Sequence, residues 1–226
     1  MDVERYQLLM LIATPKLTDR AADMFLKSAL PIQYRLHGEG TASSEIMDTL
    51  GLGSTEKGIL ISTVPESFGR TMLRMLHTQL RLDAVNSGIA FTVPLTAANN
   101  LLVRMMRQTA EDADKQETRK GEYTMAEQTH ELVAAIVNRG FSNEVMQAAR
   151  TAGAGGGTVV HSRSIGSEQA TVFWGLSVQQ EKEIVLILAE SDTKTAIMKA
   201  ISERCGMHSE AAGLVLSLPI DAVMGL

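Results

Sequence analysis

Short apolar runs of strand length alternate along the first half of the chain with segments whose apolar residues follow helical spacing. The runs "QLLMLIA" at 7–13, "EKGILI" at 56–61 and "SGIAFTVPL" at 87–95 are typical of strands that are buried in a sheet. Between them, 18–29 and 66–81 place apolar residues three and four positions apart, which predicts amphipathic helices. The pattern therefore indicates an α+β fold.

The second half repeats this succession more clearly. Ser142 is the predicted N-cap of a helix that ends at Gly153, and Ser191 that of a helix that ends at Gly206. The order β-α-β-β-α-β is that of the ferredoxin-like unit. The four predicted strands of this half are 132–138, 157–161, 183–190 and 212–220.

The two halves align with each other, which predicts a tandem duplication. "ELVAAIV" at 131–137 matches 7–13, an offset of 124 (131 − 7), and "EKEIVL" at 181–186 matches 56–61, an offset of 125 (181 − 56). Such self-similarity at a fixed period is the signature of repeated units. We therefore predict two ferredoxin-like domains, at 1–98 and 129–226, joined by a charged helical linker at 99–128.

Composition narrows the class of protein. The 226 residues carry a formal net charge of −5, which argues against a nucleic-acid binder because such proteins usually present a basic face. No apolar run approaches the roughly 20 residues of a membrane span, so membrane insertion is not expected. The start of the chain does not resemble a secretory signal, and the single cysteine, Cys205, forms no internal disulfide. We expect a cytoplasmic protein.

The stretch "TAGAGGGTVVH" at 151–161 places four glycines in five positions and then turns apolar. A dinucleotide-binding turn runs from strand to helix, and a P-loop continues with Gly-Lys-Ser/Thr, whereas here the predicted helix precedes the glycines. We therefore interpret the stretch as a helix-to-strand turn. The equivalent segment 28–37 has no glycine. The alternative is thus that the backbone of Gly155–Gly157 closely approaches a ligand or a neighbouring subunit.

The motifs "AGAGGGTVVHSR" and "SLPIDAVMGL" resemble those of the PII nitrogen regulatory superfamily, in its PII-like members, over nearly all of 131–226. The resemblance implies a non-catalytic signalling protein of three chains and six domains that binds an effector, typically an adenine nucleotide, in clefts between subunits. It also implies a loop at 162–175, containing Ser164, Gly166 and Trp174, which regulates a partner such as a membrane transporter or an enzyme of nitrogen or carbon metabolism.

The chain departs from PII proteins in two respects. The loop at 162–175 has no tyrosine, which excludes uridylylation there, and the segment before the last strand, "GMHSEAAG", has no lysine for a phosphate group. The ligand contacts that the resemblance leaves for a nucleotide are the glycine backbone and three side chains. These candidate residues are Gly155, Gly156, Gly157, His161, Arg163 and Lys182.

Each candidate side chain also has a plain structural interpretation. His161 is either a strand-edge histidine with a local hydrogen bond or a ligand contact, and Arg163 is either a solvated charge or an anion contact. We expect Glu181 and Lys182 to form an ion pair. His161 and His208 have no metal-ligand spacing, so no metal site is predicted. No catalytic constellation is present in the sequence, so we expect no enzyme, and the alternative function is that of a structural scaffold.

Overall fold

The computed structural model describes residues 5–28, 30, 33–41, 56–84, 87–98, 102, 130–163 and 181–225. The chain divides into two compact units. Unit 1 comprises Met1–Leu36, Lys57–Gln128 and Pro219–Leu226, and unit 2 comprises His37–Glu56 and Thr129–Leu218. Each unit therefore contains residues from both halves of the sequence.

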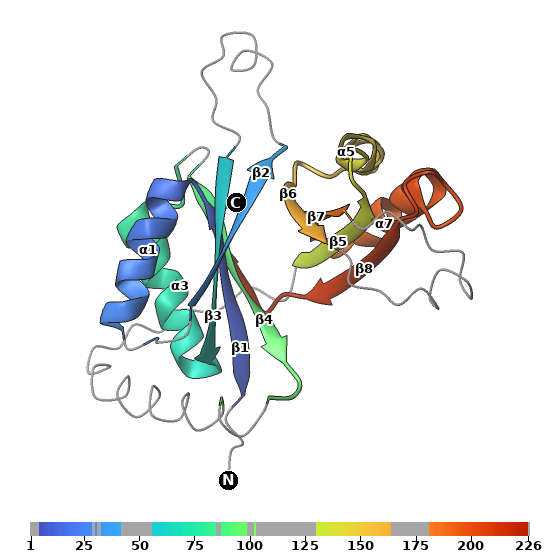
Figure 1. The fold of residues 1–226 in the computed structure, drawn as a ribbon. Coiled ribbons are helices and arrows are strands. Elements are labelled where there is room, and N and C mark those ends of the chain that lie inside the picture. The colour runs from blue at the N-terminus through green and yellow to red at the C-terminus, as the bar shows by residue number, and fades with distance from the viewer. Residues whose placement is uncertain are drawn as a thin grey trace. The chain divides into compact units, whose positions relative to one another are not determined.

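Unit 1 is an antiparallel sheet with helices on one face (Figure 1). The central strand β1 pairs with β3 on one side and with β4 on the other, and β4 pairs in turn with β9. Because side chains alternate along a strand, Leu9 and Leu11 face the helices and join the core there. The elements are β1 (Tyr6–Ala13), α1 (Pro15–Lys27), β2 (Gln33–Gly40, of which the first part belongs here), β3 (Glu56–Pro65), α3 (Glu66–Leu80), β4 (Gly88–Leu95) and β9 (Ala222–Met224).

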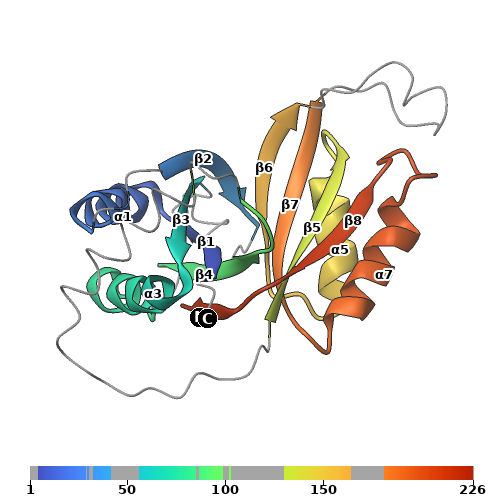
Figure 2. The ribbon, with the colours of Figure 1, turned by 90° about the horizontal axis from the view of Figure 1, so that it is seen from below.

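Unit 2 is built in the same way, with α5 and α7 on one face of its strands (Figure 2). The strands are arranged in the order β8-β5-β7-β6, and the end of β2, Gly38–Gly40, pairs with β6. In β7 every second residue is buried, so that Val185 and Ile187 pack against the helices. The elements are β5 (His130–Asn138), α5 (Ser142–Thr151), β6 (Thr158–Arg163), β7 (Glu181–Glu190), α7 (Lys194–Cys205) and β8 (Leu214–Pro219).

The predicted α+β class is confirmed, and both halves show the predicted succession β-α-β-β-α-β. The duplication that would explain this succession stays a prediction. The proposed domain boundaries also stay a prediction, but the compact units exchange two segments, 37–56 and 219–226, relative to them. Apart from Leu102, the predicted linker at 99–128 lies outside the described residues.

In the second half, the predicted helix ends are correct and the two predicted N-caps are not, whereas in the first half α3 starts at residue 66 as predicted. Gly153, with φ 101°, follows the end of α5, and Gly206 ends α7, as expected. Ser142 is the first helical residue of α5 rather than its N-cap, which is Phe141, and the N–H of Ser142 donates to the carboxylate of Glu183 from β7. Ser191 lies in the turn before α7, whose N-cap is Thr193. Strand β9 was not predicted at all.

Candidate functional site

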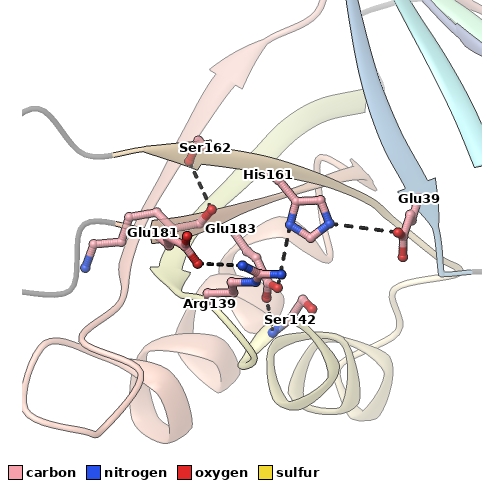
Figure 3. A network of polar contacts seen from close by, with 8 residues as sticks. Glu39, Arg139, Ser142, His161, Ser162, Glu181 and Glu183 are labelled. Carbon is pink, nitrogen blue, oxygen red and sulfur yellow. Dashed lines mark hydrogen bonds and ion pairs between the residues drawn. The ribbon is translucent and has the colours of Figure 1, made fainter.

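Charged side chains gather where β6 ends, β7 begins and α5 begins (Figure 3). The antiparallel register places His161 opposite Glu183 and Arg163 opposite Glu181. Glu39 comes from the end of β2, which is paired with β6. We call Glu39, Arg139, Ser142, His161, Glu181 and Glu183 the His161 cluster.

Glu183 is the buried member of the His161 cluster, with 5% of its surface exposed. Its Oε2 accepts a hydrogen bond of 3.0 Å from the backbone N–H of Ser142, and its Oε1 lies 3.9 Å from His161 Nδ1. The first N–H groups of a helix have no partner within the helix and carry partial positive charge, so a carboxylate there is stabilising. Glu183 thus occupies the position at the start of α5 that an external anion would otherwise take.

His161 is the accessible member, with 54% of its side chain exposed. Its Nε2 lies 3.8 Å from Glu39 Oε1, so the imidazole stands between a carboxylate of β2 and one of β7. Gly38 of β2 pairs with Val160 of β6. His37 directly precedes Gly38 and His161 directly follows Val160, so the two histidines flank this pair of residues. The interpretation of His161 as a strand residue with local polar contacts agrees with this geometry.

Glu181 forms an ion pair with Arg139, whose Nη1 lies 2.5 Å from Glu181 Oε2. The hydrogen bond and the charge of Arg139 lower the pKa of Glu181, and the charges of Arg163 and His161 lower it further. The same hydrogen bond raises the pKa of Arg139. Both side chains are about three-fifths exposed, so solvent screens the pair.

The predicted ion pair between Glu181 and Lys182 is wrong. Neighbouring residues of a strand point to opposite faces of the sheet, so the two side chains diverge. Lys182 Nζ donates instead to Asn138 Oδ1 at 2.5 Å, and Asn138 Nδ2 donates to the carbonyl of Glu210 at 2.8 Å. Partial burial lowers the pKa of Lys182.

The glycine stretch is confirmed as a helix-to-strand turn, since α5 ends at Thr151 and β6 begins at Thr158. Gly157 is held by Thr41, whose hydroxyl accepts the Gly157 N–H at 2.8 Å and whose N–H donates to the Gly157 carbonyl at 2.9 Å. A Cβ at Gly157 would lie 2.9 Å from the sulfur of Met146, so only glycine fits without a shift.

Gly155 is different, because nothing in the part of unit 2 that the structure describes requires a glycine at this position. Its φ is not positive, it is exposed, and a Cβ built on it would meet no heavy atom within 4 Å. Within the described residues, neither Gly155 nor Gly156 forms a hydrogen bond through its N–H. The helix-to-strand turn thus accounts for Gly153 and Gly157 and leaves Gly155 without a structural reason in the fold.

The predicted ligand contacts do not converge within unit 2. Gly155–Gly157 precede β6, whereas His161 and Arg163 lie at its far end. Lys182 of β7 pairs with Ser162, between His161 and Arg163, but its side chain points to the face of the sheet that is turned away from α5. Ser164, Gly166 and Trp174 of the predicted partner loop lie outside the described residues.

Sequence reasoning missed Glu39, Arg139, Glu183 and Thr41. Only Glu183 left a signal, because it is a charged residue at a position where the alternation along "EKEIVLILAE" requires burial. Glu39 and Thr41 act through the pairing of β2 with β6, which no local pattern reveals. Among the described residues, no group of three or more His, Cys, Asp or Glu is arranged to hold a metal ion.

Comparison with known proteins gives weak likenesses. No family model and no curated protein matches the chain. Among solved structures, the divalent ion tolerance protein CutA1 from Ehrlichia chaffeensis has a TM-score of 0.35 at 10% identity, over 48% of this chain and 97% of that one. A microcompartments protein from Desulfitobacterium hafniense DCB has a TM-score of 0.29 at 11% identity, over 96% of each chain. Aspartate kinase from Synechocystis has a TM-score of 0.31 at 7% identity, over 96% of this chain and 43% of that one. These scores are low, and none carries a residue role or an activity over to this chain.

No helix among the described residues is long and apolar enough to cross a membrane.

Proposed function

We propose that the chain is a non-catalytic regulatory protein of the PII-like kind, which binds a small effector and passes its bound state to a partner protein. Two features support the proposal: the succession β-α-β-β-α-β in both halves, and the motifs "AGAGGGTVVHSR" and "SLPIDAVMGL". The observation that supports an effector is Gly155, an exposed glycine that nothing in the described part of the fold requires. A residue without a side chain allows a ligand to approach the backbone closely.

The local electrostatics favour a neutral, hydrogen-bonding part of the ligand at Gly155. This residue follows the carboxyl end of α5, where the helix dipole is negative and repels phosphate. Gly155 is exposed and Gly156 is partly buried, and their N–H groups, which form no hydrogen bond within the described residues, suit an acceptor atom on a flat ring instead. The first candidate effector is therefore an adenine nucleotide whose base lies against the glycines.

The phosphate groups of such a nucleotide need cations from elsewhere. Arg163 follows Gly157 by six residues of extended chain, roughly 20 Å at about 3.3 Å per residue. One nucleotide therefore meets both Gly157 and a cation of this kind only where two chains supply them. This requirement supports an effector cleft between subunits, and we propose an assembly of three cytoplasmic chains with six domains.

The experiment is a thermal-shift screen of the full chain against ATP, ADP, AMP, cyclic dinucleotides, 2-oxoglutarate, bicarbonate and divalent metals. A ligand at about 100 times its Kd adds roughly 2.7 kcal/mol of stability, which shifts Tm by several degrees. We expect a shift with one nucleotide that is lost in Gly155→Val and in Arg163→Ala. Arg204→Ala, on the exposed last turn of α7, is the control and keeps the shift. A screen without any shift would overturn the proposal of an effector.

The output of the sensor is proposed to pass through the loop at 162–175. Its partner would be a membrane transporter or an enzyme of nitrogen or carbon metabolism. The test is whether a full chain in which Ser164–Trp174 is replaced by a Gly-Ser linker still gives the effector-dependent Tm shift while it loses effector-dependent binding to a candidate partner. A variant that keeps both responses would show that the signal leaves by another surface.

A structural scaffold is the second candidate function, and one observation favours it. Strand β8 exposes Leu214, Leu216 and Leu218, which is typical of a surface that is covered in an assembly. Sedimentation of the purified full chain separates the two candidates. Large, ligand-independent assemblies would favour the scaffold, whereas a discrete trimer would count against it.

A further inference from the structure

Strand β8 forms one edge of the sheet of unit 2 among the described strands. Its side chains at Leu214, Leu216 and Leu218 are 44%, 41% and 40% exposed. They lie two residues apart and so share one face, while Val215 between them packs against the core under α5 and α7. The exposed face of this edge strand is therefore a row of three leucines.

This edge lacks the features that keep free strand edges apart. Natural edge strands usually carry Lys or other charges, a bulge or a proline, because an open row of N–H and C=O groups pairs readily with another chain. The segment "LVLSL" at 214–218 has no charged residue, and its proline, Pro219, comes only at the end of the strand. This composition is typical of a strand whose edge is paired with another strand.

The first half of the chain shows such an edge with its added strand. Strand β4 is the last strand of the first β-α-β-β-α-β succession, as β8 is of the second. In unit 1 the outer edge of β4 carries the antiparallel strand β9, with Phe91 opposite Val223. An extended segment of this chain thus already serves as the added strand at the equivalent position.

We propose that β8 pairs antiparallel with β8 of a second copy of this chain, across a two-fold axis at Leu216. In that register Leu216 lies opposite Leu216 of the partner subunit, and Leu214 lies opposite the partner subunit's Leu218. Opposite residues of an antiparallel pair share a face, so the three leucines of each strand meet those of the other. The strand is self-complementary in pattern and in charge, which is what a two-fold interface requires.

The proposal does not depend on the proposed function. A two-fold contact produces pairs of chains or joins two trimers into six chains, and it holds for a regulator as well as for a scaffold. An edge-to-edge contact of one short strand is small, so we expect its occupancy to depend on protein concentration.

Cysteine cross-linking tests the register directly in the full chain. Opposite residues of antiparallel strands have Cα atoms about 4.5–5.5 Å apart, within the range that a disulfide spans. We expect Leu216→Cys to form an intermolecular disulfide on mild oxidation, seen on a non-reducing gel and located by mass spectrometry. The native Cys205 is buried and gives a low background.

The matched control is Leu214→Cys, which is equally exposed on the same strand. In the proposed register two such cysteines lie four residues apart along the paired strands, roughly 13 Å, and cannot be bridged. The double variant Leu214→Cys/Leu218→Cys restores opposite cysteines and cross-links. Equal cross-linking of Leu216→Cys and Leu214→Cys, or no cross-linking of either, overturns the proposal.

A charge on the axis gives an independent readout. Leu216→Lys places two ammonium groups opposite each other, and like charges at opposite positions destabilise a strand pair. By light scattering over a range of concentrations we expect its mass to be half that of the unmodified chain. The control Leu26→Lys, on the exposed end of α1, keeps the unmodified mass. An unmodified chain that stays monomeric, or a Leu216→Lys chain of unchanged mass, contradicts the pairing.

Discussion

Units 1 and 2 follow the same succession of elements with different cores. The core of unit 1 is filled by large side chains, among them Phe25 and Met72, which are fully buried. Among the described residues, the core of unit 2 has no aromatic residue at a buried position and consists mostly of valine, isoleucine and alanine, with Met146 and Cys205, and with Phe141 only partly buried at its margin. The comparison shows that cores of different residue types are compatible with the same succession of elements.

The two units also differ in how they bury a polar side chain. In unit 1 the buried Gln7 donates through Nε2 to Asp221 at 2.7 Å and so holds the C-terminal segment, but its Oε1 has no partner among the described residues. In unit 2 the buried Glu183 holds the start of α5 and uses both oxygens in polar contacts. In unit 1 the amide of Gln7 thus holds the C-terminal segment, and in unit 2 the carboxylate of Glu183 holds the start of α5.

The largest effect is expected from the core of unit 1. Phe25→Ala removes a fully buried aromatic ring and should lower the free energy of unfolding by about 3–5 kcal/mol in urea titrations. Ile201→Ala, in the core of unit 2, should cost about 2–5 kcal/mol and less than Phe25→Ala, because the cavity is smaller. Leu26→Ala, next to Phe25 but 62% exposed, is the control. A Phe25→Ala variant as stable as Leu26→Ala would contradict the comparison of cores.

The next effect concerns the charge that Glu183 brings to the start of α5. Glu183→Gln keeps the shape of the side chain and removes its charge, and we expect a loss of about 1–3 kcal/mol in the free energy of unfolding. Amide hydrogen exchange should rise first in the opening turn of α5. The control is Glu190→Gln, at the exposed end of the same strand. Equal effects of the two substitutions would show that the helix start does not depend on the carboxylate.

A pair of glycine substitutions separates structural from unexplained glycines in unit 2. Gly157→Ala brings a Cβ against Met146 and the carbonyl of Leu186 and should cost about 1–3 kcal/mol. Gly155→Ala meets open space at an ordinary φ and should raise stability by about 0.4–1 kcal/mol, because the unfolded chain loses freedom. Both values come from thermal or urea unfolding without ligand. Destabilisation by Gly155→Ala would show that the fold itself needs this glycine.

The sequence predicts the elements well because their signals are local. Alternating or continuous apolar residues reveal β1, β5 and β7, and Gly153 and Gly206 reveal helix ends, since each pattern lies within the element that it describes. Ser142 misleads by one residue, at a helix start whose first N–H is bound by Glu183 from another strand, and Ser191 lies two residues before the N-cap of α7, Thr193.

The candidate site is less predictable for the same reason. The positions of His161 and Arg163 on β6 follow from the strand pattern, but their neighbours Glu39 and Glu183 come from other strands. Strand β9 has three residues, and its pairing with β4 joins positions more than 120 residues apart in sequence, as for Phe91 and Val223. Periodicity within a short window carries no information on such pairs.

The smallest effect concerns the exposed ion pair of unit 2, which contrasts with the buried Glu183 beside it. The folded chain lowers the pKa of Glu181, so the pair contributes stability above the pKa of the unfolded chain and loses it as the pH falls through the folded pKa. Arg139→Ala should therefore destabilise slightly at neutral pH, and the difference from the unmodified chain should vanish in acid and shrink in salt. Carboxyl NMR titration should show the pKa of Glu181 rising towards its ordinary value in Arg139→Ala and not in Arg204→Ala. An unchanged titration of Glu181 would assign the lowered pKa to Arg163 and His161 instead, the other two cations that lower it.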